Sequence, residues 1–537
     1  MKSYHKIFIG LAVLCGLNQA SCTKGFEDLN KPYKDANIST LSIPSLFNRI
    51  AQKVTDESNV LYTSLLYPIT NQQGVQNVTA PYLNYSSGLW DNYYPSLLTY
   101  RWLIKKIDED PVAAPSYSNI RNMATILIVS QTLRMLDYYG DIPYSDASRA
   151  ESGVAYYRPK YDKEADVYKS ALADLEAAVN GIKLNDPTQT NIGTSESFLN
   201  YDLAAWIRFG NAIRLRYAVR LYDKEKALSN AIIIDIIGGN KPLPANQQPG
   251  NMQRNNFGFW PSKVNLPVKT ERLWYTFREK SITNMRMSSN VWKQMSSNDN
   301  VDGSGIFDPR CQIYFQTNNA EEWSAQPQSG GDQDGGDPYP GDGTKKPKGT
   351  DPQNKRSAFN IMLVSDQTYF PYLVMTEADV YFLKAEIYQR GLGVAKDITA
   401  AKSAYEAGIK SSVDFWYDYT QRSPYWIVKP EAPTPVKMTA FLSHPKVVYN
   451  GISDDDALNK IATQAWLATL FEPAEAWAIV RRTGRTPKDP TYNPPTVYRL
   501  PYPNGEKVQN LDNWKAALGG AILDPTEQIT RKLYWMP

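Results

Sequence analysis

The chain is poor in the residues that metal sites and many nucleophilic enzymes use. Its 537 residues include only two histidines and three cysteines, and beyond residue 22 only His444 and Cys311 remain. A zinc site of the common type would have too few ligands, and Ser-His or Cys-His catalysis would depend on His444 alone. We therefore expect no metal and no cofactor. Carboxylate chemistry stays open, because Asp and Glu are plentiful.

Long apolar runs are also scarce. The run Ile7–Leu17 follows a basic start with Lys2 and Lys6, and it is too short to span a bilayer. Its length suits the apolar core of a signal peptide, and small residues immediately precede Cys22. We predict a signal peptide over residues 1–21 and a lipid anchor on Cys22. The alternative is plain secretion with a buried Cys22.

Two further absences limit the partners and the core. With Cys311 as the one remaining cysteine, no internal disulfide can form, so we expect a large core in one domain over 22–537. The formal net charge is only +3 and no basic stripe is present, which argues against nucleic acid as a partner. Aromatic residues are abundant instead, with 13 Trp and 36 Tyr against 16 Phe. Tyr and Trp suit sugar stacking and wet protein interfaces equally well.

The stretch Met375–Ser411 predicts two antiparallel helices. Thr376 and Asp379 have the spacing of a capping box, Gly391 can end the first helix, and Asp397 or Thr399 can cap the second. Small residues on the facing stripes would let the helices approach closely, as in a tetratricopeptide (TPR) unit. Helical patterns occur also at Ile43–Thr55, Asp91–Ile107, Ile120–Tyr139, Tyr161–Val179, Tyr201–Leu221, Lys224–Ile237, Asp456–Leu470 and Glu472–Arg482.

The middle of the chain, mainly residues 238–371, has a different pattern. Asn, Gly, Pro and Ser dominate it, a short helix is predicted near Thr283–Met295, and Gln326–Arg356 forms a long polar loop. Loops of that length are either functional or disordered. Asn298–Gly303 matches the first half of an EF-hand loop, but the position of the bidentate Glu holds a proline, so we expect a polar turn without calcium.

Two further motifs favour structural roles. Gly140–Tyr144 combines a helix stop with a rigid turn. Arg481–Gly484 could bind an anion, but arginines at a helix C-terminus also interact favourably with the dipole and the last carbonyls. We interpret both as structural, and contact with a partner protein is the alternative for the arginines.

Seven segments along the chain form a recognisable series. They are Cys22 followed by FEDLN, MLDYYGDIPYSDA (Met135–Ala147), Asp308-Pro309-Arg310, MTEADVYFLKAEIYQRG (Met375–Gly391), IATQAWLATLFEPAEAWAIVRRTGRTP (Ile461–Pro487), RLPYPNGEKVQN (Arg499–Asn510) and the final KLYWMP. Each segment alone is unspecific, but their common order along the chain is specific. Together they resemble the SusD/RagB-like nutrient-binding lipoproteins of Bacteroidetes outer membranes.

This resemblance implies a mostly α fold of TPR-like helical hairpins, mainly over 40–237 and 372–485, with an irregular, loop-rich half. It implies a lipid-anchored protein at the cell surface that sits on a SusC-like TonB-dependent barrel transporter. The helical side would face the barrel, and the irregular side would present an oligosaccharide or, in one branch, an oligopeptide. Such proteins bind their ligands and are not enzymes.

Aromatic residues in loops are the best candidates for ligand contacts, because aromatics at helical spacing usually belong to the core. For each candidate, ordinary packing is the alternative. The two other functions that we consider are a glycosidase with two carboxylates and a TPR scaffold that binds only protein. The candidate ligand-binding residues are Tyr82, Tyr85, Trp90, Trp260, Trp323 and Tyr339.

Overall fold

The computed structural model covers most of the chain after residue 40. It describes residues 41–53, 61–74, 87–261, 285–327, 354–365, 369–426, 428–450, 453–490 and 496–537. Cys22 and the candidates Tyr82, Tyr85 and Tyr339 lie outside these residues. Within them, no helix combines the length and the apolar character that crossing a membrane requires.

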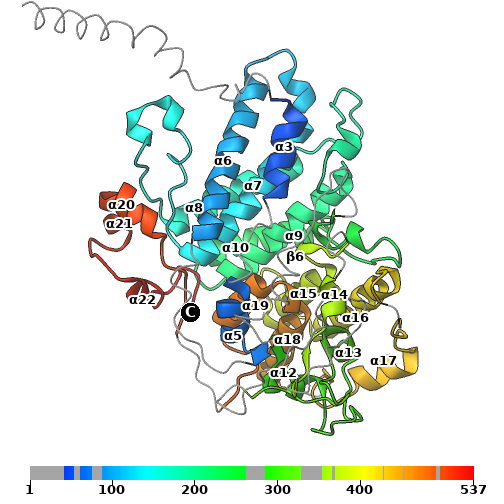
Figure 1. Cartoon of the computed structure of the whole chain (residues 1–537). Coiled ribbons are helices and arrows are strands. Elements are labelled where there is room, and N and C mark those ends of the chain that lie inside the picture. The colour runs from blue at the N-terminus through cyan, green and yellow to red at the C-terminus, as the bar shows by residue number, and fades with distance from the viewer. Residues whose placement is uncertain are drawn as a thin grey trace, which may run out of the picture.

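Antiparallel helices build the N-terminal half, at the top of Figure 1. Helix α7 lies at the centre of this half. It packs against α6, α8 and α9, and most of its side chains are buried. The helices begin and end within a few residues of the predicted ranges. They are α3 (Ile43–Gln52), α6 (Ser87–Asp108), α7 (Ser118–Tyr139), α8 (Glu164–Asn180), α9 (Leu203–Leu221) and α10 (Lys226–Ile233).

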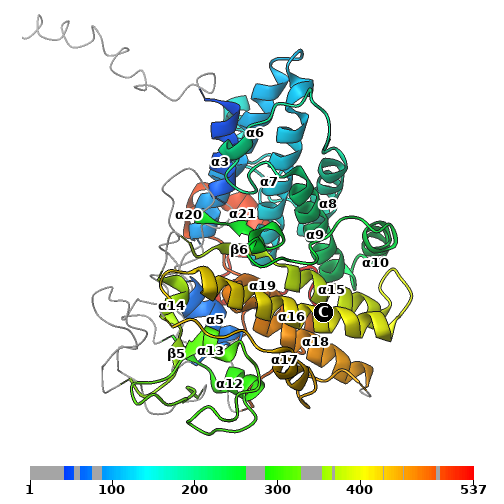
Figure 2. The same cartoon turned by 90° about the vertical axis from the view of Figure 1, so that its right-hand side faces the viewer.

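The predicted hairpin is present as α15 (Glu377–Arg390) and α16 (Ile398–Arg422), which cross the middle of Figure 2. The Asp379 N–H donates to Thr376 Oγ1 at 3.2 Å, and Asp379 Oδ2 accepts from the Thr376 N–H at 2.9 Å. Gly391 ends α15 in the left-handed conformation, and Asp397 caps α16. The predicted capping box and hairpin are therefore confirmed.

Small residues decide how closely α15 and α16 approach. Ala401 and Ala404 are buried in this interface. A Cβ atom on Gly408 would lie only 2.9 Å from Phe382 Cε1, so the glycine lets the phenyl ring rest on the helix backbone. Helix α18 (Asp454–Ala468) then packs on both helices of the hairpin, and α19 (Pro473–Thr483) packs on α18.

The irregular middle of the chain is organised around a small antiparallel sheet of order β1-β3-β5-β4. Helix α13 (Cys311–Tyr314) leads directly into β4, and α12 (Ser289–Met295) follows β3. A separate pair of strands, β2 (Phe257–Phe259) and β6 (Tyr372–Met375), links this region to α15. The sheet strands are β1 (Gln73–Gly74), β3 (Arg286–Met287), β4 (Phe315–Gln316) and β5 (Ala358–Phe359).

The C-terminal segment folds back onto the N-terminal helices. The Leu500 N–H donates to Tyr138 O at 2.7 Å, and the Tyr534 N–H donates to Glu164 Oε1 at 2.7 Å. Three short helices, which the sequence analysis did not predict, lie along this segment at the left of Figure 1. They are α20 (Asn504–Gln509), α21 (Leu511–Ala517) and α22 (Pro525–Gln528).

The Gly140–Tyr144 turn has the structural role that the sequence predicted. Gly140 ends α7 with φ of 72°. Asp141 Oδ1 accepts from the Glu164 N–H at 2.9 Å, which joins the turn to the start of α8. Asp162 Oδ2 accepts from the Tyr144 N–H at 2.8 Å.

Candidate functional site

Two hollows carry polar and aromatic side chains suited to binding. The first, which we call the aromatic cleft, has a volume of about 640 Å³ and lies beside α13 and α17 (Pro435–Leu442), at the lower end of the molecule in Figures 1 and 2. Its walls come from the irregular middle of the chain, from α16 and from the segments that follow α16. It is lined by Asp302, Gly303, Ile306, Phe307, Pro309, Gln312, Trp323, Tyr417, Glu431, Pro433, Lys437, Ala440, Phe441 and His444.

Trp323 forms one wall of the cleft. Its indole stacks on Trp292, with ring centroids 6.0 Å apart and an angle of 15° between the planes. The Trp292 Nε1–H donates to Asp299 Oδ1 at 2.9 Å, so the supporting ring is itself held in place. The backbone N–H of Trp323 donates to Val301 O at 2.8 Å, and Gly303 leaves the space that the indole fills.

His444 also lines the cleft. Its imidazole stacks on Phe307, with centroids 3.6 Å apart and an angle of 11°. Partial burial and the nearby positive charges of Lys446 and Lys460 lower the pKa of His444 below its usual value of 6.5. The imidazole is therefore neutral at pH 7, and the cleft presents it as a flat, uncharged surface.

Polar groups lie between these aromatic walls. Gln312 Nε2 donates to Tyr417 Oη at 2.6 Å, and the Tyr417 hydroxyl donates to Pro309 O at 3.0 Å. Lys437 and the acids on the rim are exposed. Flat apolar faces next to amide, hydroxyl and charged groups are the combination that sugar rings and their hydroxyls require.

The three aromatic candidates among the described residues, Trp90, Trp260 and Trp323, do not gather at one place. Trp323 lies in the cleft. Trp90 is 5% exposed and is surrounded by Tyr94, Tyr139 and Tyr502, with ring centroids 5.0 to 5.8 Å away. This burial on a helix face favours ordinary packing for Trp90, the alternative given above for each candidate.

Trp260 also belongs to the packing of the fold and not to the cleft. It is 6% exposed, its Nε1–H donates to Asn256 O at 3.0 Å, and its ring meets the edge of Phe415 at 6.1 Å. This burial favours ordinary packing, the alternative given above for each candidate, and a ligand contact at Trp260 stays a prediction. The predicted loop position of Trp260 did not indicate exposure, because Trp260 directly follows strand β2, which pairs with β6.

Four aromatic residues of the cleft were not predicted: Phe307, Tyr417, Phe441 and His444. Tyr417 lies on α16, beyond the predicted end of the hairpin at Ser411, and nothing in the sequence near His444 indicates a site. Only tertiary contacts, such as the stack of His444 on Phe307, bring these residues together.

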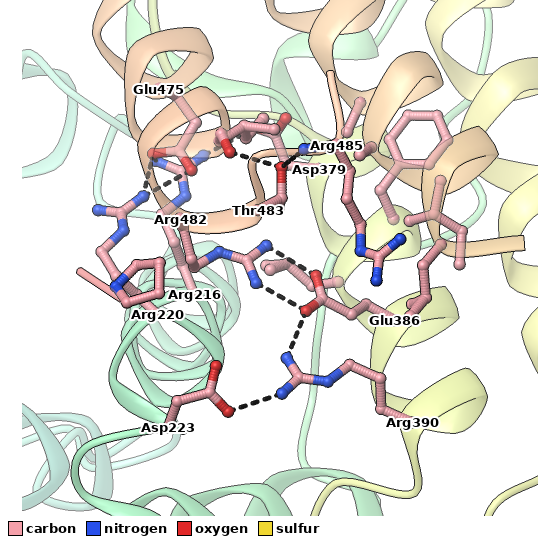
Figure 3. A pocket seen from close by; sticks show the side chains of 18 residues that line it. Arg216, Arg220, Asp223, Asp379, Glu386, Arg390, Glu475, Arg482, Thr483 and Arg485 are labelled. Carbon is pink, nitrogen blue, oxygen red and sulfur yellow. Dashed lines mark hydrogen bonds and ion pairs between the residues drawn. The ribbon is translucent and has the colours of Figure 1, made fainter. Parts of the chain in front are cut away.

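The second hollow, which we call the charged cavity, has a volume of about 310 Å³ and lies between α9, α15, α18 and α19 (Figure 3). Its wall joins two of the sequence motifs noted above. Arg482, from RRTG, donates through both terminal nitrogens to Glu386, from FLKAE, at 2.6 and 2.7 Å. Arg390 donates to the same carboxylate at 2.8 Å.

These arginines control the charge of Glu386. Burial alone would raise its pKa, but the positive charges of Arg482 and Arg390 outweigh burial and lower the pKa to about 2. The carboxylate is therefore ionised throughout the physiological range. Deeper in the cavity, Arg216 pairs with Asp379 at 2.8 Å.

The neighbouring Arg481 has a different role. Its Nη1 donates to Asp137 O at 2.8 Å and to Tyr498 O at 2.7 Å, while the guanidinium lies 3.4 Å from the ring centre of Trp477. It also donates to the carbonyl of Trp477 in its own helix at 3.3 Å. Arg481 and Arg482 thus mainly join α19 to other elements, and contact with the last carbonyls of α19 is a minor part of their role.

The described residues contain no group of three or more His, Cys, Asp or Glu side chains placed to hold a metal ion. The half EF-hand motif uses its oxygens within its own turn. Asn298 Oδ1 accepts from the Asn300 N–H at 3.0 Å, and Asp302 Oδ1 accepts from the Ser304 N–H at 2.8 Å. These contacts are those of a polar turn.

Comparison with known proteins agrees with this architecture. A family model described as SusD-like, starch-binding and associating with the outer membrane matches residues 31–503. No curated protein matches. A structure described as Bacteroidetes AC2a SusD-like has 20% identity and a TM-score of 0.69, and the alignment covers 93% of this chain and 100% of that one.

Two further solved structures are similar at the level of the fold. A chitin-binding SusD homologue from Flavobacterium johnsoniae has 20% identity and a TM-score of 0.63, with coverage of 92% of this chain and 98% of that one. A SusD homologue from Parabacteroides distasonis has 19% identity and a TM-score of 0.66, with coverage of 91% and 98%. Since the family model spans most of the sequence, the chain belongs to the SusD-like family of starch-binding, outer-membrane-associated proteins.

Proposed function

We propose that this protein is a cell-surface lipoprotein that captures oligosaccharides in the aromatic cleft and delivers them to a SusC-like TonB-dependent transporter. Membership of a starch-binding family supports glycan as the ligand class. A relative of the same fold described as chitin-binding points in the same direction. In this proposal the protein binds its ligand without chemical turnover.

The observation that carries the proposal is the stacked pair of Trp323 on Trp292 in a wall of the cleft. Stacking the apolar face of a sugar on an indole removes apolar area from water, at roughly 25 cal/mol per Å². The neutral imidazole of His444 offers a second flat face. Amide, hydroxyl and charged groups between the faces can bind sugar hydroxyls. Such a site binds weakly enough to pass its cargo on.

Calorimetric titration with chito-oligosaccharides and malto-oligosaccharides tests this site. We expect Trp323→Ala to weaken binding by about 1–3 kcal/mol, by analogy with the stacking of bases on aromatic side chains. The matched control is Tyr157→Ala, which removes an aromatic residue that is 65% exposed and lies outside the cleft. A thermal melt of each variant separates lost binding from lost folding.

The same titrations separate the competing functions. Equal glycan affinity in the Trp323→Ala variant would place the site elsewhere. Binding of oligopeptides instead of glycans would favour the oligopeptide alternative. Release of reducing sugar from any of these glycans would indicate a glycosidase. Tight binding to a barrel partner without affinity for glycan or peptide would support a protein scaffold.

The lipid anchor is tested separately at Cys22. Because the thiol of Cys22 is the proposed site of lipid attachment, Cys22→Ala should release the protein from the membrane fraction. The measurement is fractionation of cells that lack the neighbouring transporter gene. A variant that still sediments with the membranes in those cells would contradict the anchor assignment.

A further inference from the structure

The wall of the charged cavity has more arginines than acids. Five arginines and four acids line it. Four of the arginines have an acidic partner within the wall: Arg216 with Asp379 at 2.8 Å, Arg220 with Glu475 at 2.6 Å, Arg482 with Glu386 at 2.6 Å and Arg390 with Asp223 at 2.8 Å. Arg485 is the fifth.

Arg485 has its acidic partner outside the cavity. Its Nη1 pairs with Asp455 at 2.5 Å and donates to Asn459 Oδ1 at 2.9 Å. The side chain of Asp455 is 71% exposed, and that of Arg485 is 33% exposed. Figure 3 shows the Arg485 guanidinium in the space on the same side as Glu386, with no line joining it to the carboxylates drawn there.

Arg390 is in a similar position on the other side of the opening. One terminal nitrogen pairs with buried Glu386, and the other pairs with Asp223, whose side chain is 61% exposed. Exposed ion pairs contribute about 0–1 kcal/mol each. Asp223 and Asp455 can therefore yield these two guanidinium groups to another anion at little cost, while the buried pair of Glu386 and Arg482 stays intact.

Part of the wall between these charges is apolar. Helices α15, α18 and α19 contribute Leu383, Leu458, Ile461, Ala465 and Ile479. The volume of about 310 Å³ falls at the lower end of the range for small-molecule sites. A ligand that fits would therefore be small, with an anionic group at the opening and a short apolar body.

We propose that the charged cavity is a second ligand site, which binds small carboxylates with a short apolar body. The carboxylate lies between Arg390 and Arg485, since the planar guanidinium matches a carboxylate with two parallel hydrogen bonds. The apolar body contacts Leu383 and Leu458. The excess of arginine excludes amines of the same shape. This site shares no lining residue with the aromatic cleft.

Hexanoate is the probe, and hexylamine of the same chain length is the control for charge. Calorimetric titration of the full protein at pH 7 should show hexanoate binding and no hexylamine binding. Arg485→Gln should weaken hexanoate binding by roughly tenfold, the effect of losing one charge-assisted contact. Arg158→Gln, which changes an exposed arginine outside the cavity, should leave the affinity unchanged.

Asp455→Asn provides a test in the opposite direction. Removing this acid frees Arg485, so hexanoate affinity should increase roughly two- to fivefold. A purely structural role of the ion pair would not increase affinity. The proposal is overturned by any one of three results. They are no hexanoate binding at about 20 mM, hexylamine binding as tight as hexanoate binding, and no gain in hexanoate affinity in the Asp455→Asn variant. Oligosaccharide binding should be the same in all these variants, so this test and that of the aromatic cleft fail independently.

Discussion

At the scale of single residues, Gly303 determines where Trp323 lies. Its φ of +77° is in the left-handed region, and a Cβ there would lie 2.7 Å from Cδ1 and Nε1 of the Trp323 indole. A side chain at this position must therefore displace the indole or shift the turn. The position of the aromatic wall therefore depends on the absence of a side chain at Gly303.

We expect Gly303→Ala to weaken oligosaccharide binding to an extent comparable with Trp323→Ala, about 1–3 kcal/mol. The measurement is calorimetric titration together with the tryptophan fluorescence spectrum. Gly520→Ala is the matched control, since Gly520 has φ of +86° but no atoms near the added Cβ. If both alanine variants bind glycan like the native protein, Gly303 does not position the wall.

His444 gives the cleft wall a pH dependence. Because its pKa in the fold lies below the usual 6.5, the unfolded chain binds a proton more readily than the folded one. Its contribution to stability is therefore complete above about pH 6.5 and decreases as the pH falls from there through the folded pKa.

The expected result is a melting temperature that decreases between pH 7 and pH 5, with a smaller decrease in His444→Phe. Phenylalanine preserves a flat ring against Phe307 but cannot be protonated. The measurement is a series of thermal melts at constant ionic strength. Identical pH profiles for the two proteins would show that protonation of His444 does not affect the fold.

At the scale of secondary structure elements, the interface between α15 and α16 depends on small side chains. Ala404 is only 6% exposed in this interface. Ala404→Glu would bury a charge without a partner and should destabilise the protein by several kcal/mol. Chemical denaturation measures the change. Ser403→Glu is the control, because residue 403 is exposed on the same helix and should tolerate the charge.

The sequence motifs of the family lie far apart in the chain, but the helices that carry them contact one another through ion pairs. Glu386 on α15 and Arg482 on α19 are 96 positions apart and form a bidentate ion pair. Asp379 on α15 likewise reaches Arg216 on α9. Residues of the family motifs thus connect helices through ion pairs, and these ion pairs lie in the wall of the charged cavity.

At the scale of the whole molecule, the C-terminal segment is held on the N-terminal helices through Glu164. Its Oε1 accepts from the Tyr534 N–H at 2.7 Å, and burial raises its pKa to about 8. A carboxyl whose pKa is raised by folding contributes stability below its unfolded pKa of about 4.5. That contribution is lost as the pH rises through the folded value.

We expect the stability of the native protein relative to that of Glu164→Gln to decrease between about pH 4.5 and pH 8, the interval between the unfolded and folded pKa values of Glu164. Glutamine can still accept from the Tyr534 N–H but cannot ionise. Thermal melts across this range test the difference, with Glu109→Gln as a control at an exposed carboxylate at the end of α6. A Glu164→Gln profile parallel to that of the native protein would contradict the role of this carboxyl.

The sequence by itself determined the helical part of this protein. Local signals were sufficient there, because the capping box of Thr376 and Asp379, the helix stop at Gly391 and the stripe of Ala401 and Ala404 all act within a few residues of chain. The common order of the family motifs then identified the fold. The lipid anchor, the division at residue 22 and the candidates Tyr82, Tyr85 and Tyr339 stay predictions.

Only the tertiary structure decided which aromatic residues form a wall and which form the core. Trp90 and Trp323 were both candidates for ligand contacts, yet Trp90 is buried among tyrosines from other segments and Trp323 borders an open cleft. The same applies to His444 on Phe307, and to the five arginines that surround one cavity. These arrangements depend on contacts between residues far apart in the chain, which local periodicity does not encode.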